Sequence, residues 1–375
     1  MGLGTSSVLP RTEVIFSLFK LLFYDFRSLS IYSIIKKKSQ CLCVIYLRVA
    51  CTLINFIVKL LRIICSSNTA LPFEPSKNLT KNPMVKLFDS HCHLQDSRIY
   101  NVAPKLIQEA LDTGVTHFAV NGVSEKDWYV VKEMSDRHSS IIPNFGLHPW
   151  FISERTPDWL NTLKQFLTAN PCAAVGEIGL DKGSMAKHID YTDQVEVFRL
   201  QLQLAKEFKR PASVHCVSAF GDLLEILEST GPFPAGIVLH SYIGSAEMVP
   251  EFSKLNAYFS FSGHLMSMKE SKAKQMLKSV PFERILLETD APDARPKSVD
   301  PKSLFLINES DDVEDGLSLP AESLNHPANI HHILAYVSGL LEMEEEDLAR
   351  MSYENAVRVF SYESSKLVQE GEERH

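Results

Sequence analysis

The sequence of 375 residues has little cysteine outside its first 65 residues. Seven cysteines are present, and the longer part of the chain retains only Cys92, Cys172 and Cys216. Three widely spaced cysteines do not form the disulfide framework of a small secreted domain, and they are typical of a reducing compartment. We therefore expect a cytoplasmic or nuclear location, or an organelle if the N-terminal region is a genuine transit segment.

Long apolar runs are also missing. The first 83 residues are apolar and basic, yet no charge-free run among them approaches the roughly 20 residues that a membrane-spanning helix needs. Their acid-poor composition leaves an organelle transit peptide or a membrane-surface helix as alternatives, and membrane association through residues 1–65 is not favoured. Our preferred interpretation is that the functional polypeptide begins at Met84, directly before the first predicted strand and after a linker over residues 71–83.

Net positive charge is confined to this N-terminal region. Residues 1–82 hold 11 Lys or Arg against 3 acidic residues, whereas the whole chain has a formal net charge of −8, so the remainder carries −16. Such a body has no overall attraction for nucleic acid. A polyanionic substrate must therefore be held by local groups or by metal ions.

From residue 84 onward, short apolar runs alternate with longer amphipathic patterns, which is typical of parallel β-α-β units. Eight runs have strand character, the number that closes a barrel: 85–88, 117–120, 141–145, 172–175, 212–214, 236–239, 257–261 and 284–287. Helical spacing of apolar residues predicts helices between them: 104–113, 128–137, 159–168, 194–208, 219–227, 246–255 and 269–278. The sequence thus predicts an α/β fold, a (β/α)8 TIM-type barrel over residues 84–361 with capping helices at 330–341 and 345–360. A poorly defined extension, 1–83, precedes it, and a charged tail, 362–375, follows.

Residues with metal-ligand chemistry follow the predicted strands, at the end where TIM barrels build their active sites. His91 and His93 are spaced so that both imidazoles of an extended chain face one point. The strand exits together contribute four histidines and two carboxylates: His91, His93, Glu177, His215, His240 and Asp290. Six such ligands exceed the about three of one catalytic ion and predict two divalent cations roughly 4 Å apart. Imidazole with carboxylate suits Zn, Mn, Ni or Fe.

Individual roles follow from position in this series. Glu177, near its middle, is expected to bridge the cations, and Asp290 is expected to act as general base while remaining a ligand. Asp89 and Asp181 are expected behind the ligands, holding their ring N–H groups. His148 is expected to contact substrate, because Pro-Trp directly after it indicates a shaped loop.

Other reactive side chains are assigned to packing or to the surface. Cys92 and Cys216 adjoin ligand histidines but alternate to the opposite face, so both are expected to pack in the core. Histidines outside the strand exits are expected at the surface: His117, His138, His188, His264 and His375.

Several short motifs in fixed order resemble those of the TatD family of metal-dependent deoxyribonucleases, within the amidohydrolase-like barrels. They are Phe-Asp-Ser-His-Cys-His-Leu (88–94), Gly-Leu-His-Pro-Trp (146–150), Gly-Glu-Ile-Gly-Leu-Asp (176–181), His215, His240, Glu-Thr-Asp-Ala-Pro (288–292) and Asn-His-Pro-Ala-Asn (325–329). The resemblance implies a barrel, two divalent cations (Mg, Mn or Zn), DNA as substrate and exonucleolytic hydrolysis of phosphodiester bonds by a metal-activated water. By position it assigns His91 and His93 to one metal site, His215 and His240 to the other, Glu177 to the bridge, and Asp290 to ligand and base.

The sequence departs from that family in three places. The family usually has arginine two residues after its fifth-strand histidine, where this chain has Val217, and one candidate phosphate contact is thereby lost. The sixth-strand motif reads His-Ser-Tyr-Ile-Gly (240–244) instead of continuing into Phe-Ser-Gly. An insertion over about 293–324 carries many acidic residues and is expected to repel DNA or to act as a lid: Asp300, Glu309, Asp311, Asp312, Glu314, Asp315 and Glu322.

The leading hypothesis is a two-metal phosphodiesterase acting on DNA from an end, without a stable protein partner. One alternative is hydrolysis of a small ester or amide, since the same barrel and ligands serve other amidohydrolases. Glu177 stands where a bridging lysine would follow the fourth strand, which favours the nuclease. A second alternative is a non-catalytic binding protein, and the presence of all six ligand-type residues argues against it.

Overall fold

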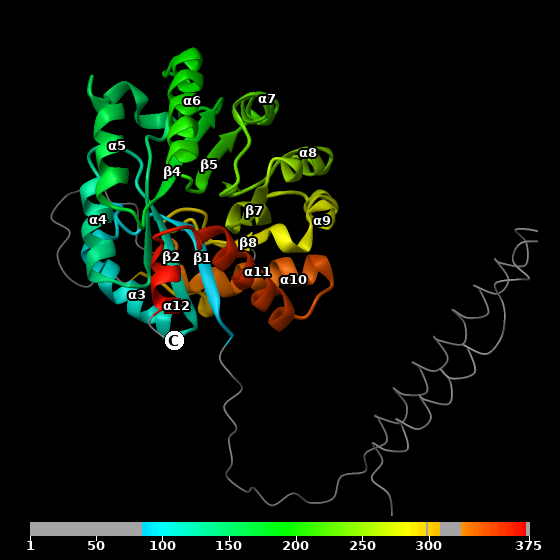
Figure 1. Ribbon diagram of the computed structural model, residues 1–375. Helices are drawn as coiled ribbons and strands as arrows, with labels where there is room; N and C mark the ends of the chain where they lie inside the picture. Colours follow the sequence, from blue (N-terminus) through cyan, green and yellow to red (C-terminus); the bar gives the residue numbers. More distant parts are fainter. Residues whose placement is uncertain (1–84, 298, 308–323, 373–375) are drawn as a thin grey trace, which may run out of the picture. The chain divides into compact units, whose positions relative to one another are not determined.

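The structure, a computed structural model, describes residues 85–297, 299–307 and 324–372. The expectations for residues 1–83 and for most of the acidic insertion lie outside this part of the chain. Eight parallel strands follow one another around a barrel in chain order (Figure 1). They are β1 Leu87–Cys92, β2 Val115–Asn121, β3 Ile141–Phe145, β4 Ala174–Asp181, β5 Ala212–Val217, β6 Ile237–Leu239, β7 Ala257–Phe261 and β8 Ile285–Leu287.

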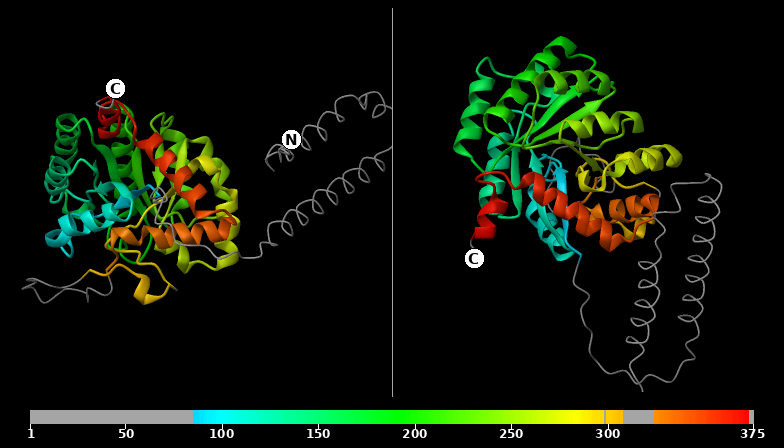
Figure 2. Two further views of the ribbon diagram at one scale, coloured as in Figure 1. Left: turned by 90° about the horizontal axis from the view of Figure 1, so that it is seen from below. Right: turned by 45° about the vertical axis from the view of Figure 1, so that its right-hand side comes forward.

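Seven α-helices alternate with the strands and cover the outside of the barrel (Figures 1 and 2). They are α3 Ala103–Asp112, α4 Trp128–Arg137, α5 Trp159–Ala169, α6 Tyr191–Glu207, α7 Phe220–Thr230, α8 Val249–Lys254 and α9 Glu270–Ser279. Each buries one apolar face; in α3 this face is Ala103, Leu106, Ile107 and Ala110. Within the described residues, no helix has the length and apolar character needed to cross a membrane.

The barrel closes where β1 meets the segment after β8. The amide of Asp290 donates to the carbonyl oxygen of His91 at 2.9 Å, and the amide of His93 donates to that of Ala291 at 2.7 Å. The hydroxyl of Ser90 adds a bond of 2.9 Å to the carbonyl oxygen of Leu287. These bonds bring the first strand exit beside the last, and the (β/α)8 barrel predicted from the sequence is confirmed.

The C-terminal helices are α10 Ile330–Leu341, α11 Glu345–Phe360 and α12 Lys366–Glu372. Helix α11 closes the end of the barrel opposite the predicted site: Ala356, Val359 and Phe360 pack with inward-facing residues from the starts of the strands. The ring of Phe360 stacks on that of Phe88 at 5.2 Å. The predicted cap is therefore present, and α12 lies within the stretch expected as a charged tail.

Several strands extend further than predicted, and one histidine lies elsewhere than expected. Strands β1, β4 and β5 continue through the ligand motifs, because those residues still pair with their neighbours. His117 was expected at the surface, but it is 8% exposed within β2 and stacks on Phe88 at 5.4 Å. Its ring packs in the floor of the barrel, so that expectation was wrong.

Candidate metal centre

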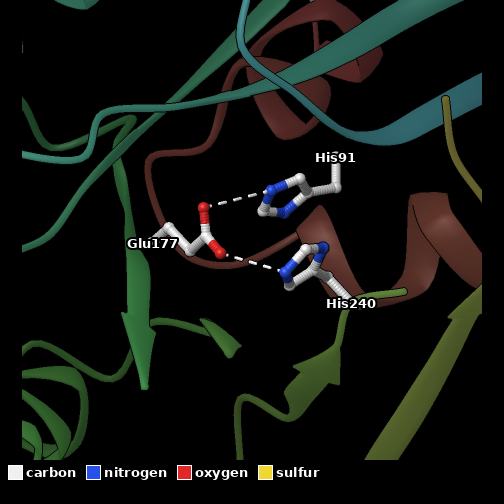
Figure 3. Close-up of side chains that lie close together, drawn as sticks. All are labelled: His91, Glu177 and His240. Carbon is white, nitrogen blue, oxygen red and sulfur yellow. Dashed lines mark ion pairs between the residues drawn. The ribbon is translucent and has the colours of Figure 1, made fainter. Parts of the chain in front are cut away.

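Glu177 lies at the centre of the residues with metal-ligand chemistry. It belongs to β4, is 2% exposed, and directs its two carboxylate oxygens to different histidines (Figure 3). Oε2 lies 3.5 Å from Nε2 of His91, and Oε1 lies 2.9 Å from Nε2 of His240. The carboxylate therefore stands between two groups of imidazoles, one group at each oxygen.

The first cluster consists of His91, His93 and Asp290 around Oε2 of Glu177. The Nε2 atoms of His91 and His93 are 3.2 Å apart, and that of His93 is 3.2 Å from Oε2. Oδ1 of Asp290 completes the cluster at 3.6 Å from Nε2 of His93 and 3.9 Å from that of His91. The closure of β1 against β8 produces this group.

The second cluster consists of His148, His215 and His240 around Oε1 of Glu177. Nδ1 of His215 lies 3.1 Å from Oε1, and Nε2 of His148 lies 3.4 Å from it. Nδ1 of His215 and Nε2 of His240 are 3.2 Å apart. All six residues expected as metal ligands thus meet in one place, together with His148.

The spacing of these atoms fits divalent cations. Two nitrogens bound tetrahedrally to one ion at about 2.0–2.1 Å lie about 3.3 Å apart. The pairs His91–His93 and His215–His240 both have separations of 3.2 Å. Three overlapping groups of His, Glu and Asp have ligand atoms within 4.8 Å of one another, and Glu177 belongs to two of them. The donor set is therefore suited to divalent cations, and Glu177 joins His91 to His240 in one of the three groups.

Hydrogen bonds at the far ring nitrogens determine which nitrogens are available as ligands. Nδ1 of His93 lies 2.9 Å from the carbonyl oxygen of Asn121 and must donate to it, which leaves a lone pair on Nε2. Nε2 of His215 similarly faces Oδ2 of Asp181 at 3.4 Å, which leaves Nδ1 free toward Glu177. Asp181 thus holds a ring N–H, in agreement with its expected place behind the ligands.

His148 has the opposite arrangement. Its Nδ1 accepts a hydrogen bond of 3.2 Å from the amide of Trp150, so the proton of the neutral ring is on Nε2, which faces Glu177. Burial lowers the pKa of His148 to about 4, and the ring is neutral near pH 7. His148 therefore presents an N–H donor to the site, whereas His93 and His215 in their neutral forms would present lone pairs.

Three supporting residues were not identified from the sequence. Ser213 Oγ lies 2.9 Å from Nδ1 of His91. The indole of Trp150 donates to Oδ2 of Asp181 at 2.5 Å. The fully buried Glu288 lies behind the second cluster, where its Oε1 is 3.5 Å from Nδ1 of His240. Glu288 could have been identified from the sequence, because it stands at a strand exit, two residues before Asp290.

The expectation for Asp89 was wrong in its detail. Its carboxyl group holds no ring N–H; it accepts from the amide and the hydroxyl of Thr289 at 2.8 and 2.5 Å. Burial raises the pKa of Asp89 to about 8, against the hydrogen bonds from Thr289. Asp89 thus fastens β1 to the segment after β8 and acts on the site through the backbone.

His264 is exposed, as expected, but it lies at the site and not outside it. It follows β7, and its Nε2 lies 3.5 Å from Oδ2 of Asp290, although 49% of its side chain is exposed. The cysteines behave as expected, since Cys92 is fully buried and Cys216 packs against the core. His264 therefore belongs to the mouth of the site.

The clustered charges shift the titration of the carboxylates and imidazoles. Burial alone would raise the pKa of Glu177, but the surrounding imidazoles outweigh it and hold the pKa well below its usual range. Asp290 behaves in the same way, since the hydrogen bond from His264 and the charge of His240 outweigh its burial. Burial would lower the pKa of His93, yet Glu177 and Asp290 raise it to about 9. The ion-free site therefore holds protons that a cation would displace.

Glycine allows two strands of the site to approach closely. At Gly179 of β4, where φ is +153°, a Cβ atom would lie 2.0 Å from the carbonyl oxygen of His215. No side chain fits there, so the backbone of β5 lies directly against β4 and brings His215 to Glu177. The Gly-Glu-Ile-Gly motif is thus a packing requirement as well as a source of a ligand.

Comparison with known proteins agrees with this geometry. The model of a family described as TatD related DNase matches residues 88–361. An uncharacterised metal-dependent hydrolase of Bacillus subtilis, YabD, is 30% identical over 73% of this chain and 98% of its own length. A protein of Pantoea ananatis named 3′-5′ ssDNA/RNA exonuclease TatD is 27% identical over 73% of this chain and 99% of its own.

Among solved structures, the TatD homologue YJJV of Escherichia coli superimposes with a TM-score of 0.63. It is 22% identical, and the match covers 75% of this chain and 100% of that one, which supports the fold. The family match spans every strand exit that contributes to the two clusters. On these grounds the chain is a metal-dependent hydrolase that belongs to the family of TatD-related DNases.

Proposed function

We propose that this protein is a nuclease that removes nucleotides from the end of a DNA strand by hydrolysis, with two divalent cations held on either side of Glu177. The observation that carries the proposal is the division of the Glu177 carboxylate, with Oε2 in the first cluster and Oε1 in the second. The name of the Pantoea relative, an exonuclease of single-stranded DNA and RNA, supports the substrate class.

The proposed ligands are His91, His93 and Asp290 on one side, and His215 and His240 on the other. When bound there, divalent cations polarise a phosphoryl oxygen and make an attacking water more acidic. Glu177 would offer one carboxylate oxygen to each cluster, so that the few protein ligands on either side could hold a catalytic cation. Magnesium, manganese and zinc are the candidate ions.

Asp290 is the proposed general base. Its pKa lies well below the ordinary value, so the carboxylate is ionised at neutral pH and can take a proton from the attacking water. Oδ1 faces the first cluster and Oδ2 faces His264 at 3.5 Å, so the two oxygens have separate surroundings. Ligation and proton acceptance can thus be divided between them.

His148 is the proposed substrate contact. With its proton on Nε2, it is a poor ligand but a suitable donor to a non-bridging phosphate oxygen. Its neutral state at pH 7 supports hydrogen bonding rather than ion pairing. Trp150 and Asp181 fix this ring and that of His215 in one chain of contacts.

The test uses the full chain, stripped with a chelator and reloaded with Mg²⁺, Mn²⁺ or Zn²⁺. Substrates are single- and double-stranded DNA labelled at either end, single-stranded RNA, and a carboxylic ester as a generic substrate. We expect metal-dependent shortening of DNA from one end, reduced at least about a hundredfold in Glu177→Gln because both cations lose a ligand.

Glu225→Gln, on the exposed face of α7, is the matched control and should leave the rate unchanged. Ester hydrolysis without phosphodiester hydrolysis would identify a small-molecule amidohydrolase instead. DNA hydrolysis that survives Glu177→Gln at full rate would refute the mechanism.

A further inference from the structure

Four basic side chains lie on the β7–β8 side of the barrel mouth. His264 and Lys269 belong to the connection between β7 and α9, while Arg295 and Lys297 belong to the segment that follows β8. We call His264, Lys269, Arg295 and Lys297 the basic rim. Its innermost member, His264, lies 3.5 Å from Asp290, so the rim begins at the candidate metal centre.

The two parts of the basic rim form one surface. A Cβ atom at Gly263 would lie 1.9 Å from the carbonyl oxygen of Ala294, so the two backbones are in direct contact. Lys297 bonds through its amide to Sδ of Met266 at 3.2 Å and through Nζ to Oγ of Ser267 at 2.9 Å. The segment after β8 is therefore fixed on the β7–α9 connection.

The far side of that segment is anchored as well. Asn325 donates from its amide to the carbonyl oxygen of Pro292 at 2.8 Å, and from Nδ2 to that of Thr289 at 2.9 Å. These bonds hold the chain between β8 and the rim in place. The basic side chains of the rim are thus carried on a fixed backbone. Free energy of substrate binding is therefore not spent on ordering a loop.

Asp293, the carboxylate closest in sequence to Arg295, is already paired with an arginine outside the rim. Asp293 accepts two hydrogen bonds from Arg98, at 2.9 and 2.7 Å, so it does not compete for the rim cations. Both Lys269 and Lys297 are exposed, and within the described part of the chain neither ammonium group forms an ion pair with a carboxylate.

Several lysines elsewhere on the barrel are engaged by acidic side chains. Lys126, Lys164 and Lys254 are each paired with a glutamate, at 2.6, 2.6 and 2.7 Å. Lys269 and Lys297 lie outside such pairs, beside the site, in a body whose net charge is −16. They are the local positive groups that a polyanion would need here.

We propose that the basic rim binds the phosphodiester backbone of a single nucleic acid strand, on the side of the mouth away from the second cluster. The strand would run from the scissile phosphate at Asp290 over His264 and then past Arg295, Lys297 and Lys269. This proposal rests on the proposed function and adds the path of the substrate. The rim contributes only where the substrate extends beyond the reacting phosphate.

The first experiment measures binding alone. The full chain with Lys269→Gln, Arg295→Gln and Lys297→Gln is titrated into a fluorescein-labelled oligothymidylate in EDTA, with fluorescence anisotropy as the signal. Each lost phosphate contact lowers the slope of log affinity against log salt by about 0.7 for single strands, so the expected decrease is about 2. The control, Lys126→Gln, Lys164→Gln and Lys254→Gln, has the same change in net charge and should keep the native slope.

The second experiment separates the rim from the metal centre. With metal restored, the rim variant should hydrolyse bis(4-nitrophenyl) phosphate at the native kcat/KM, whereas its KM for the oligonucleotide rises about tenfold or more. Equal losses on both substrates, or an unchanged salt slope, would overturn the proposal. Because the binding measurement needs no hydrolysis, failure of the proposed nuclease activity would be seen separately from failure of the rim.

Discussion

Replacing Glu288 by glutamine should weaken one metal site and leave the other intact. The carboxyl group is fully buried, and its Oε1 accepts from the amide and hydroxyl of Ser241 at 2.7 and 2.8 Å. The same oxygen lies 3.5 Å from Nδ1 of His240, on the ring edge opposite the nitrogen that faces Glu177. Glutamine retains this acceptor oxygen but removes the acidic partner of His240.

The expected magnitude follows from these contacts. Loss of an outer partner of a metal ligand typically costs about 10–100-fold in affinity, which corresponds to about 1.4–2.7 kcal/mol. Oε2 of Glu288 has no hydrogen-bond partner among the described residues, so the new amide nitrogen would also be unsatisfied. Because Oε2 already lacks a partner in the native chain, the substitution adds no new buried unsatisfied group to the folded state.

The assay is a titration of the chelator-treated full chain in competition with a chromophoric chelator, which resolves two binding steps. Glu288→Gln should weaken the step of the second cluster. Ser213→Ala removes the hydroxyl 2.9 Å from Nδ1 of His91, and it should weaken the metal-binding step of the first cluster. If both variants weakened the same step, or if Glu288→Gln changed neither, the assignment of His240 and His91 to separate clusters would be refuted.

Three further predictions follow from the site and its strands. Trp150→Phe removes the donor that helps to lower the pKa of Asp181 to about 2. Above pH 4, the free energy of unfolding of this variant should therefore be smaller than that of the native protein. The difference should vanish as the pH falls through about 2, as urea denaturation across a pH series would show, and a pH-independent difference would contradict it. Because the pKa of His93 is about 9 without metal, cation binding at pH 7 should release a proton, and affinity should rise about tenfold per pH unit toward pH 9. Calorimetry in two buffers of different ionisation enthalpy measures that release, and identical heats would contradict it. Gly179→Ala should prevent close pairing of β4 with β5 and lower stability by several kcal/mol, whereas Gly221→Ala, where a Cβ meets no atom within 4 Å, should be tolerated in the same urea experiment.

The order of the elements could be predicted because each strand is a short apolar run followed by a polar exit. Helices α4, α10 and α11 begin and end at the predicted residues, since their apolar spacing is regular. The ends of strands β1, β4 and β5 could not be predicted. Polar residues of the site, such as His91 and Asp181, interrupt the apolar pattern, although their backbones remain paired with the neighbouring strands.

That the six expected ligands lie together could be predicted because each follows a strand, and parallel strands of a barrel end at one mouth. The surroundings of those ligands could not, since Ser213, Asn121 and Glu288 act through ring nitrogens whose orientation depends on packing. His264 was missed because a histidine three residues beyond the apolar run of β7 carries no distinctive pattern.

The closure of the barrel also has a consequence for how the protein acquires metal. His91 lies in the first strand, whereas Asp290 follows the last, and the two are joined by a backbone bond. During synthesis the ribosome must therefore complete some 200 further residues before the first cluster can assemble. The floor beneath it comes later still, with Phe360. Assembly of the first cluster is accordingly a late event in the synthesis of the chain.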